Sequence, residues 1–153
     1  MVNKISIKTE FGWISAYESK GKIFKVNFGK INKYTSSKVL KKFKKNLYSF
    51  LNKKNKYIKI PYEIEGNTSQ KKVWNELKKI KLGSTKTYGD IAKKYKLSPR
   101  HVGKICGQNK ILLVIPCHRV IRSDGSLGGF SSKGGIKLKK KLLKFERNWK
   151  LKV

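Results

Sequence analysis

Cys117 and the histidine that follows it, His118, are the residues of this chain whose types and spacing best suit covalent chemistry. The nucleophilic form of cysteine is the thiolate, which needs a nearby cation or hydrogen-bond donor. His118 is a candidate base. Neighbouring side chains point in different directions on a regular element, so a bridging water is a reasonable link to the thiol. Residues 111–117 carry no charge, and we therefore expect the thiol at the end of a buried segment.

Glu146 is the candidate partner of His118. A histidine that acts as a base needs a group that orients it, and Glu146 is the one acid that follows Asp124 in the sequence. It lies beside the apolar positions of residues 136–149, where a carboxylate needs a polar partner. This pattern indicates a chain of contacts from Glu146 through His118 to Cys117.

Structural interpretations of the same residues are also open. A cysteine at the end of an apolar run is often a small buried hydrophobe. A zinc site formed by His101, Cys106, Cys117 and His118 lacks any standard ligand spacing, so we expect neither a metal nor a cofactor. Cys106 is expected in the core, at helical spacing from Val102, and His101 is expected in solvent or facing a phosphate.

The charge of the chain favours a polyanionic partner. Its 153 residues include 39 Lys plus Arg and 8 Asp plus Glu, a formal net charge of +31. Nucleic acid is the commonest partner of a protein with so strong a positive charge. A lysine-rich surface produced by AT-rich coding or by a hot habitat explains the charge equally well. Arginine is the better residue for planar recognition, and the chain has four: Arg100, Arg119, Arg122 and Arg147.

The sequence shows no signal peptide and no apolar run long enough to span a bilayer. The two cysteines, Cys106 and Cys117, are expected as thiols, as in an intracellular protein. We therefore expect a cytoplasmic protein that does not contact membranes.

The first part of the chain has the pattern of a small sheet with a helix. Partial alternation and turn-like breaks predict three strands at 4–9, 13–18 and 23–29. Apolar residues on one face and lysines on the other predict a helix over 36–51. A further strand is expected over 56–64, ending by Pro61, followed by a linker over 65–69.

The second part has helical periodicity. A helix is predicted over 69–80, and another begins near Thr87, whose spacing to Asp90 resembles a capping box. Ser98 suits an N-cap and Pro99 the first helical position, so a further helix follows a turn of about three residues. This is the outline of a helix-turn-helix, with Arg100 at its exposed first turn.

These elements predict an α+β protein. Its N-terminal domain, residues 1–64, is expected to contain a small β-sheet and a helix. Its C-terminal domain, residues 65–153, is expected to be mostly helical and to hold the helix-turn-helix and the candidate site.

The segment "IPCHRVI", residues 115–121, resembles the active-site signature of the O-6-alkylguanine-DNA alkyltransferases, also called methylated-DNA–protein-cysteine methyltransferases. "VWNELKKIKLGSTKTYGDIAKK" resembles the family's helix, loop and first helix of the DNA-binding motif, and "SPRHVG" resembles its recognition helix. "SLGGFSS" and "GGIKLKKKLLKFE" resemble its substrate loop and closing helix. Residues 1–60 carry almost no signature.

This resemblance implies a single-use DNA repair enzyme. The protein would rotate O-6-alkylguanine, and also O-4-alkylthymine, out of duplex DNA and transfer the alkyl group irreversibly to Cys117. His118 would act as the base through a water, and Glu146 would orient it. Asn109 would organise the surroundings of the thiol, and Tyr88 would donate toward the guanine leaving group.

The resemblance also implies contacts with double-stranded DNA through the minor groove, made by a monomer. Arg100 would enter the base stack as an arginine finger. The remaining DNA-binding positions would be Tyr88, Ser69, Ser123, Thr87 and Gly103. The substrate-binding positions would be Ser131, Phe130, Val120 and Lys139.

Two of the chain's departures from the family pattern affect the surroundings of the candidate cysteine and the pocket. Residues 109–112 read "NKIL" where the family usually has "NPxP", which predicts a less rigid connection before the candidate cysteine. The loop that contains Ser131 is about two residues longer than usual, which changes the mouth of the pocket.

Two other classes of protein remain open. An alkyltransferase-like lesion binder would keep the fold but replace the cysteine, which is present here. A plain helix-turn-helix regulator with a structural cysteine would need neither Glu146 nor the glycine-rich loop before the last helix.

Overall fold

The computed structural model describes residues 1–32, 34–130 and 134–150 of the chain. By their contacts the residues form two compact units. The first contains Met1–Ile64, Lys110–Val114 and the C-terminal end from Trp149, and the second contains Glu65–Asn109 and Ile115–Asn148. The first unit thus includes two short segments that the sequence analysis placed in the C-terminal domain.

The sheet of the first unit has three antiparallel strands in the order β1-β2-β3. Their bounds are Asn3–Thr9, Gly12–Ser19 and Lys22–Phe28, so the three predicted strands are confirmed. Lys20 and Gly21 connect β2 to β3 with φ of 52° and 79°. Positive φ at both central residues is what a two-residue type I′ hairpin requires.

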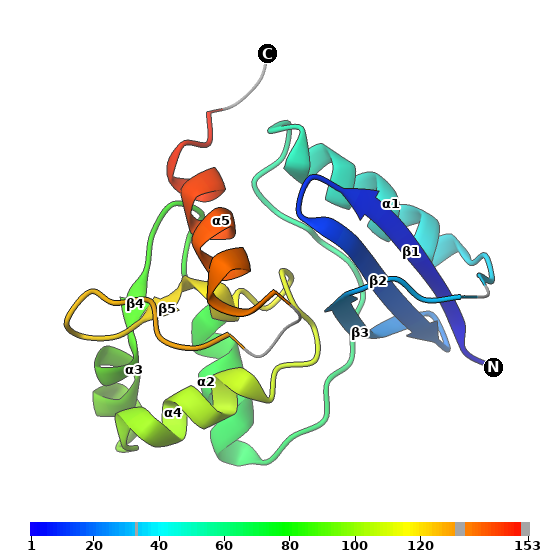
Figure 1. Ribbon diagram of the computed structural model, residues 1–153. Coiled ribbons are helices and arrows are strands. Elements are labelled where there is room, and N and C mark those ends of the chain that lie inside the picture. The colour runs from blue at the N-terminus through cyan, green and yellow to red at the C-terminus, as the bar shows by residue number, and fades with distance from the viewer. Residues whose placement is uncertain (33, 131–133, 151–153) are drawn as a thin grey trace. The chain divides into compact units, whose positions relative to one another are not determined.

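Helix α1, Lys38–Leu51, lies across one face of this sheet (Figure 1) and contacts all three strands. Its buried side chains include Leu40, Phe43 and Leu47, and its lysines lie on the opposite face. The helix begins after Ser37, whose side chain accepts a hydrogen bond from the Leu40 backbone N–H. The predicted helix is confirmed, with a later start because Ser37 is its N-cap.

The prediction of a strand over residues 56–64 is wrong. This segment makes only an isolated bridge, between Tyr62 and Ile23. The Ile23 N–H donates to the Pro61 carbonyl at 2.9 Å, and the Glu63 N–H donates to the Ile23 carbonyl at 2.9 Å. Proline has no N–H to continue a ladder, which accounts for the short pairing at Pro61.

Residues 110–114, in the apolar segment before the candidate cysteine, form a turn attached to β3. The Val26 N–H donates to the Lys110 carbonyl at 2.9 Å, and the Leu112 N–H donates to the Val26 carbonyl at 3.2 Å. Leu113 has φ of 70°, in the left-handed region that residues other than glycine rarely adopt. These bonds attach the segment to β3.

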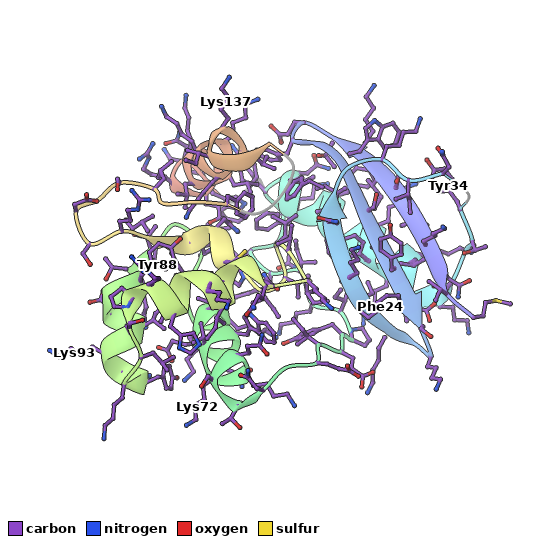
Figure 2. The ribbon with its side chains drawn as sticks, turned by 60° about the horizontal axis from the view of Figure 1, so that its bottom comes forward. Phe24, Tyr34, Lys72, Tyr88, Lys93 and Lys137 are labelled. Atoms are coloured by element: carbon purple, nitrogen blue, oxygen red, sulfur yellow. The ribbon has the colours of Figure 1, made fainter. Side chains whose placement is uncertain are left out.

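Helices dominate the second unit: α2 (Thr68–Lys78), α3 (Tyr88–Tyr95), α4 (Pro99–Gly107) and α5 (Gly135–Arg147). A single 3-10 turn, η1, spans Cys117–Arg119. Two short strands, β4 (Lys86–Thr87) and β5 (Val120–Ile121), pair in parallel. Figure 2 shows the side chains of Lys72, Lys93 and Lys137 extending outward from α2, α3 and α5.

The start of α2 corrects the predicted linker. Asn67 and Gln70 form a reciprocal capping box, so the helix begins at Thr68 and residues 67–69 belong to its first turn. Helices α2, α3 and α4 contact one another. The buried Trp74 joins α2 to α4 by donating from Nε1 to the Ile105 carbonyl at 3.2 Å.

The caps predicted for α3 and α4 are confirmed. Thr87 and Asp90 form a reciprocal capping box at the start of α3. The Ser98 side chain accepts from the His101 N–H, and Pro99 is the first residue of α4. Lys96 ends α3 in the left-handed conformation, with φ of 56°. Local side-chain chemistry therefore sets this turn.

The fold is α+β, as the sequence predicted. Among the described residues, no helix combines the length and the apolar character needed to cross a membrane.

Candidate active site

Cys117 is the first residue of η1, directly after Pro116, and its side chain is buried, with the residue only 4% exposed. Its N–H donates to the Ile115 carbonyl at 2.8 Å. The next residues enter β5, which pairs with β4. Backbone bonds on both sides therefore fix the thiol in position, in the buried setting that the sequence predicted.

A cavity of about 720 Å³ opens at this thiol. A volume of this size is typical of sites for small organic ligands. The lining residues come from α3, α4, η1 and the loop after β5: Tyr88, Pro99, Arg100, Gly103, Cys106, Gly107, Cys117, Arg122, Ser123, Gly128, Gly129 and Phe130. The loop thus completes a pocket whose wall includes the candidate nucleophile.

His118, 1% exposed, lies beside Glu146 on α5. The two are joined by a hydrogen bond of 2.8 Å between Nε2 and Oε2. Within the described part of the chain, His118 Nδ1 has no hydrogen-bond partner. An ionised carboxylate can only accept, so this contact places the proton of a neutral imidazole on Nε2 and leaves Nδ1 as an acceptor.

Arg119 is the functional residue that the sequence analysis missed. Its Nε and Nη2 donate to the two oxygens of Glu146, each at 2.8 Å, and its Nη1 donates to the Ile80 carbonyl at 2.7 Å. The signal was available, because an arginine in a mostly apolar segment needs a carboxylate partner. The buried carboxylate of Glu146 thus has two polar partners, the adjacent residues His118 and Arg119.

The surroundings of Glu146 favour its ionised form. Burial opposes ionisation, but the charges and hydrogen bonds of His118 and Arg119 outweigh it and lower the pKa of Glu146 to about 2. The carboxylate is therefore charged across the physiological range and fixes the orientation of both neighbours.

The surroundings of the Cys117 thiol have opposing effects on its ionisation. Burial raises the pKa of Cys117, while a hydrogen bond from the Asn109 side chain and the charge of Lys139 oppose this rise. Asn109 also donates from Nδ2 to the Ile115 carbonyl at 2.8 Å. The amide thus connects the end of α4 to the backbone just before the candidate cysteine.

Lys139 is fully buried on α5 and contacts Tyr88. Its ammonium donates to the Tyr88 hydroxyl and to the Gly129 carbonyl, both at 3.2 Å. Burial lowers the pKa of Lys139 to about 8, although negative charge on Cys117 would raise it. Burial likewise raises the pKa of Tyr88 to about 12, so the phenol keeps its proton and can donate it in a hydrogen bond.

Gly128 makes room for Tyr88. A Cβ at this position would lie 3.0 Å from Tyr88 Cε2, and the φ of Gly128 is 72°. Both the close contact and the left-handed backbone require glycine here.

A second buried carboxylate, Glu76, holds the segment that carries Tyr88. Its oxygens accept from the ammonium groups of Lys86 at 2.9 Å and Lys94 at 3.0 Å, and from the Tyr95 hydroxyl at 2.9 Å. Burial opposes ionisation, but these donors lower the pKa of Glu76 to about 2. The cluster joins α2 to both ends of the segment from β4 to α3, a link that the sequence analysis did not foresee.

Of the other residues named from the sequence, some line the cavity and some do not. Arg100, Ser123 and Phe130 line it, as does Gly103, whose nearest neighbour in the direction of a side chain is the Tyr88 ring. Val120 is buried in β5, Thr87 caps α3 and Ser69 lies in the first turn of α2. None of these last three lines the cavity within the described chain, and Ser131 lies outside the described residues. Cys106, expected in the core, is buried but also lines the cavity.

Known proteins match this chain in sequence over its second part and in structure over nearly its whole length. Residues 68–148 match the model of the 6-O-methylguanine DNA methyltransferase DNA-binding domain. A methylated-DNA–protein-cysteine methyltransferase of Methanocaldococcus vulcanius is 50% identical over 88 residues, which are 58% of this chain and 53% of that protein. The matched regions span between 45% and 65% of the curated relatives' own lengths.

Two solved structures are similar over nearly the whole chain. An O6-methylguanine DNA methyltransferase of Methanococcus jannaschii is 30% identical with a TM-score of 0.71, covering 97% of this chain and 96% of that one. A Mycobacterium tuberculosis OGT solved in complex with DNA is 25% identical with a TM-score of 0.84, covering 94% of this chain and 92% of that one. The chain belongs to the O6-methylguanine DNA methyltransferase family.

Proposed function

We propose that this protein repairs DNA by transferring an alkyl group from O-6 of guanine to its own Cys117. The observation that supports this most directly is the buried thiol in the wall of a cavity of about 720 Å³, next to a histidine that Glu146 orients. Family membership and the similarity to an OGT solved with DNA support the same activity. O-4-alkylthymine is proposed as a second substrate.

The proton of the thiol leaves through His118 in this mechanism. Glu146 fixes the proton of the imidazole on Nε2, so Nδ1 accepts the proton of Cys117 through a bridging water. The imidazolium formed is stabilised by Glu146, which Arg119 holds by two further bonds. Asn109 and Lys139 stabilise the thiolate as it forms.

Transfer of the alkyl group then follows as a displacement. The Cys117 sulfur forms a bond to the alkyl carbon, the carbon–O-6 bond breaks, and its electron pair remains on guanine. Tyr88 donates a hydrogen bond toward the departing base, and Lys139 in turn donates to the Tyr88 oxygen. Hydrolysis does not cleave the thioether product, so each molecule acts once.

The substrate base must leave the duplex before it can reach the cavity. Arg100 is exposed on the first turn of α4 and lines the cavity. We propose that it enters the base stack from the minor groove. We propose phosphate or backbone contacts for the remaining DNA-binding positions: Ser69, Thr87, Gly103 and Ser123. The base would be bound by Phe130, Val120 and Ser131, and the protein would act as a monomer.

The test is the mass of the intact protein after incubation with a duplex that contains one O-6-methylguanine. We expect the gain of one methyl group per molecule, located on the peptide that contains Cys117. A bound but unmodified protein would instead indicate a lesion-binding protein. No preference for the methylated duplex would indicate a helix-turn-helix regulator.

Replacing Arg100 with alanine should slow repair of duplex DNA far more than reaction with free O-6-benzylguanine. Extrusion of the base depends on the finger, whereas the bond-making step does not. Single-turnover rates on both substrates give the comparison. Equal slowing on both would assign Arg100 to the reaction itself or to folding.

A further inference from the structure

The outward face of α1 carries five exposed lysines within the first eight residues of this 14-residue helix. They are Lys38, Lys41, Lys42, Lys44 and Lys45. Four of them, Lys38, Lys41, Lys42 and Lys45, follow the spacing i, i+3, i+4, i+7, which places them on one side of a helix. We call these four residues the α1 lysine face.

The charges of this face are not neutralised by acids. The helix contains no Asp or Glu, and the sequence has none between Ser19 and Tyr62, where lysine recurs throughout. In the described part of the chain, the ion pairs involve Glu76 and Glu146, and none reaches the α1 lysine face.

This arrangement costs stability in the free protein. Like charges three and four residues apart on a helix repel one another. Cations near a helix N-terminus also oppose the macrodipole, which favours anions there. A lysine surface that only aided solubility would suit the C-terminal half of α1 better, where its cations would complement the dipole. A bound polyanion would remove both costs.

We propose that the α1 lysine face binds the phosphate backbone of duplex DNA, as a contact surface additional to the active site. At about 1.5 Å rise per residue, Lys38 and Lys45 are about 10 Å apart along the helix, within the reach of flexible lysines to successive phosphates. Lysine acts on phosphate as a point charge and reads no sequence. The apolar face of α1 is buried in the first unit, so it is not available to enter a lipid surface.

The proposal deepens the proposed function, since it takes DNA as the substrate. A single-use protein must find rare lesions, and phosphate contacts that ignore sequence support sliding and rapid association. The α1 lysine face would therefore contribute to undamaged and damaged DNA equally, and not to the chemical step.

The variant Lys41→Gln/Lys42→Gln/Lys45→Gln tests this role, because glutamine has nearly the helix propensity of lysine. The matched control is Lys8→Gln/Lys20→Gln/Lys22→Gln, which removes the same charge from exposed positions of β1 and the β2–β3 hairpin. The dissociation constant for an undamaged duplex is measured against salt concentration. Each lost phosphate contact lowers the slope of log K against log salt by about 0.9, so we expect the α1 variant to lose about 2 to 3 in slope. The control should lose less than about 1.

Two further readouts complete the test. The α1 variant should melt at the same temperature as the wild type or higher, and its reaction with free O-6-benzylguanine should be unchanged. Equal slope changes in both variants would overturn the proposal, because net charge alone would then explain them. The α1 variant is also tested for binding to phosphatidylserine vesicles. If it loses vesicle binding while the salt dependence of its DNA binding is unchanged, the face binds anionic lipid instead, and the proposal is overturned. A wild type that binds DNA but never reacts with the free base would refute the proposed function alone.

Discussion

Substitution of Cys117 by serine abolishes alkyl transfer and leaves duplex binding largely intact. A serine hydroxyl at this buried position has no means to ionise near neutral pH, so the nucleophile is lost. The proposed phosphate contacts lie elsewhere and position the DNA without taking part in the chemistry. Intact mass after incubation with O-6-methylguanine duplex measures the transfer, and fluorescence anisotropy measures the binding.

Cys106→Ser is the matched control, because Cys106 is buried at the wall of the same cavity. Burial raises the pKa of both thiols, so the pKa does not separate them. Cys117 directly precedes the His118–Glu146 pair and Cys106 does not, so replacement of Cys106 should preserve transfer. Abolition of transfer in the control alone would identify Cys106 as the alkyl acceptor and end the mechanism built on Cys117.

Glu146→Gln is expected to slow single-turnover repair by about tenfold or more and to destabilise the fold by about 3 kcal/mol. The amide can still accept a hydrogen bond but leaves the Arg119 charge buried without its counter-ion. It also no longer supports a charged imidazolium, so the rate of Cys117 alkylation should fall. His118→Ala should slow repair more, since it removes the base itself. A surface role for Glu146 would leave repair rate and stability unchanged.

The pH dependence of stability gives an independent check on the same contact. The folded pKa of Glu146 is about 2, below its ordinary value of 4.5, so its stabilising effect is complete above pH 4.5 and is lost as the pH falls toward 2. The stability difference between wild type and Glu146→Gln should therefore be largest above pH 4.5 and shrink below it. Thermal melts of both proteins across this range measure the difference. A difference that stays constant with pH would show that the ionised carboxylate does not stabilise the fold.

Local sequence patterns alone determined much of this protein. Alternation predicted the three strands, and amphipathic spacing predicted α1. The capping residues Thr87, Ser98 and Pro99 predicted the starts of α3 and α4 correctly. Each of these features depends on residues within a few positions of one another, so its physical cause is contained in a short segment. Glu146 could be paired with His118 because an acid near an apolar stripe needs a partner.

Only the tertiary structure decided what brings the site together. Arg119 and Glu146 are far apart in sequence, and so are Lys139 and Tyr88, and Glu76 and Lys94. The strand expected over 56–64 failed for the same reason, since a strand requires a partner as well as a pattern. Propensity acts along the chain, whereas ion pairs, cavities and sheet edges depend on which distant residues the fold brings into contact.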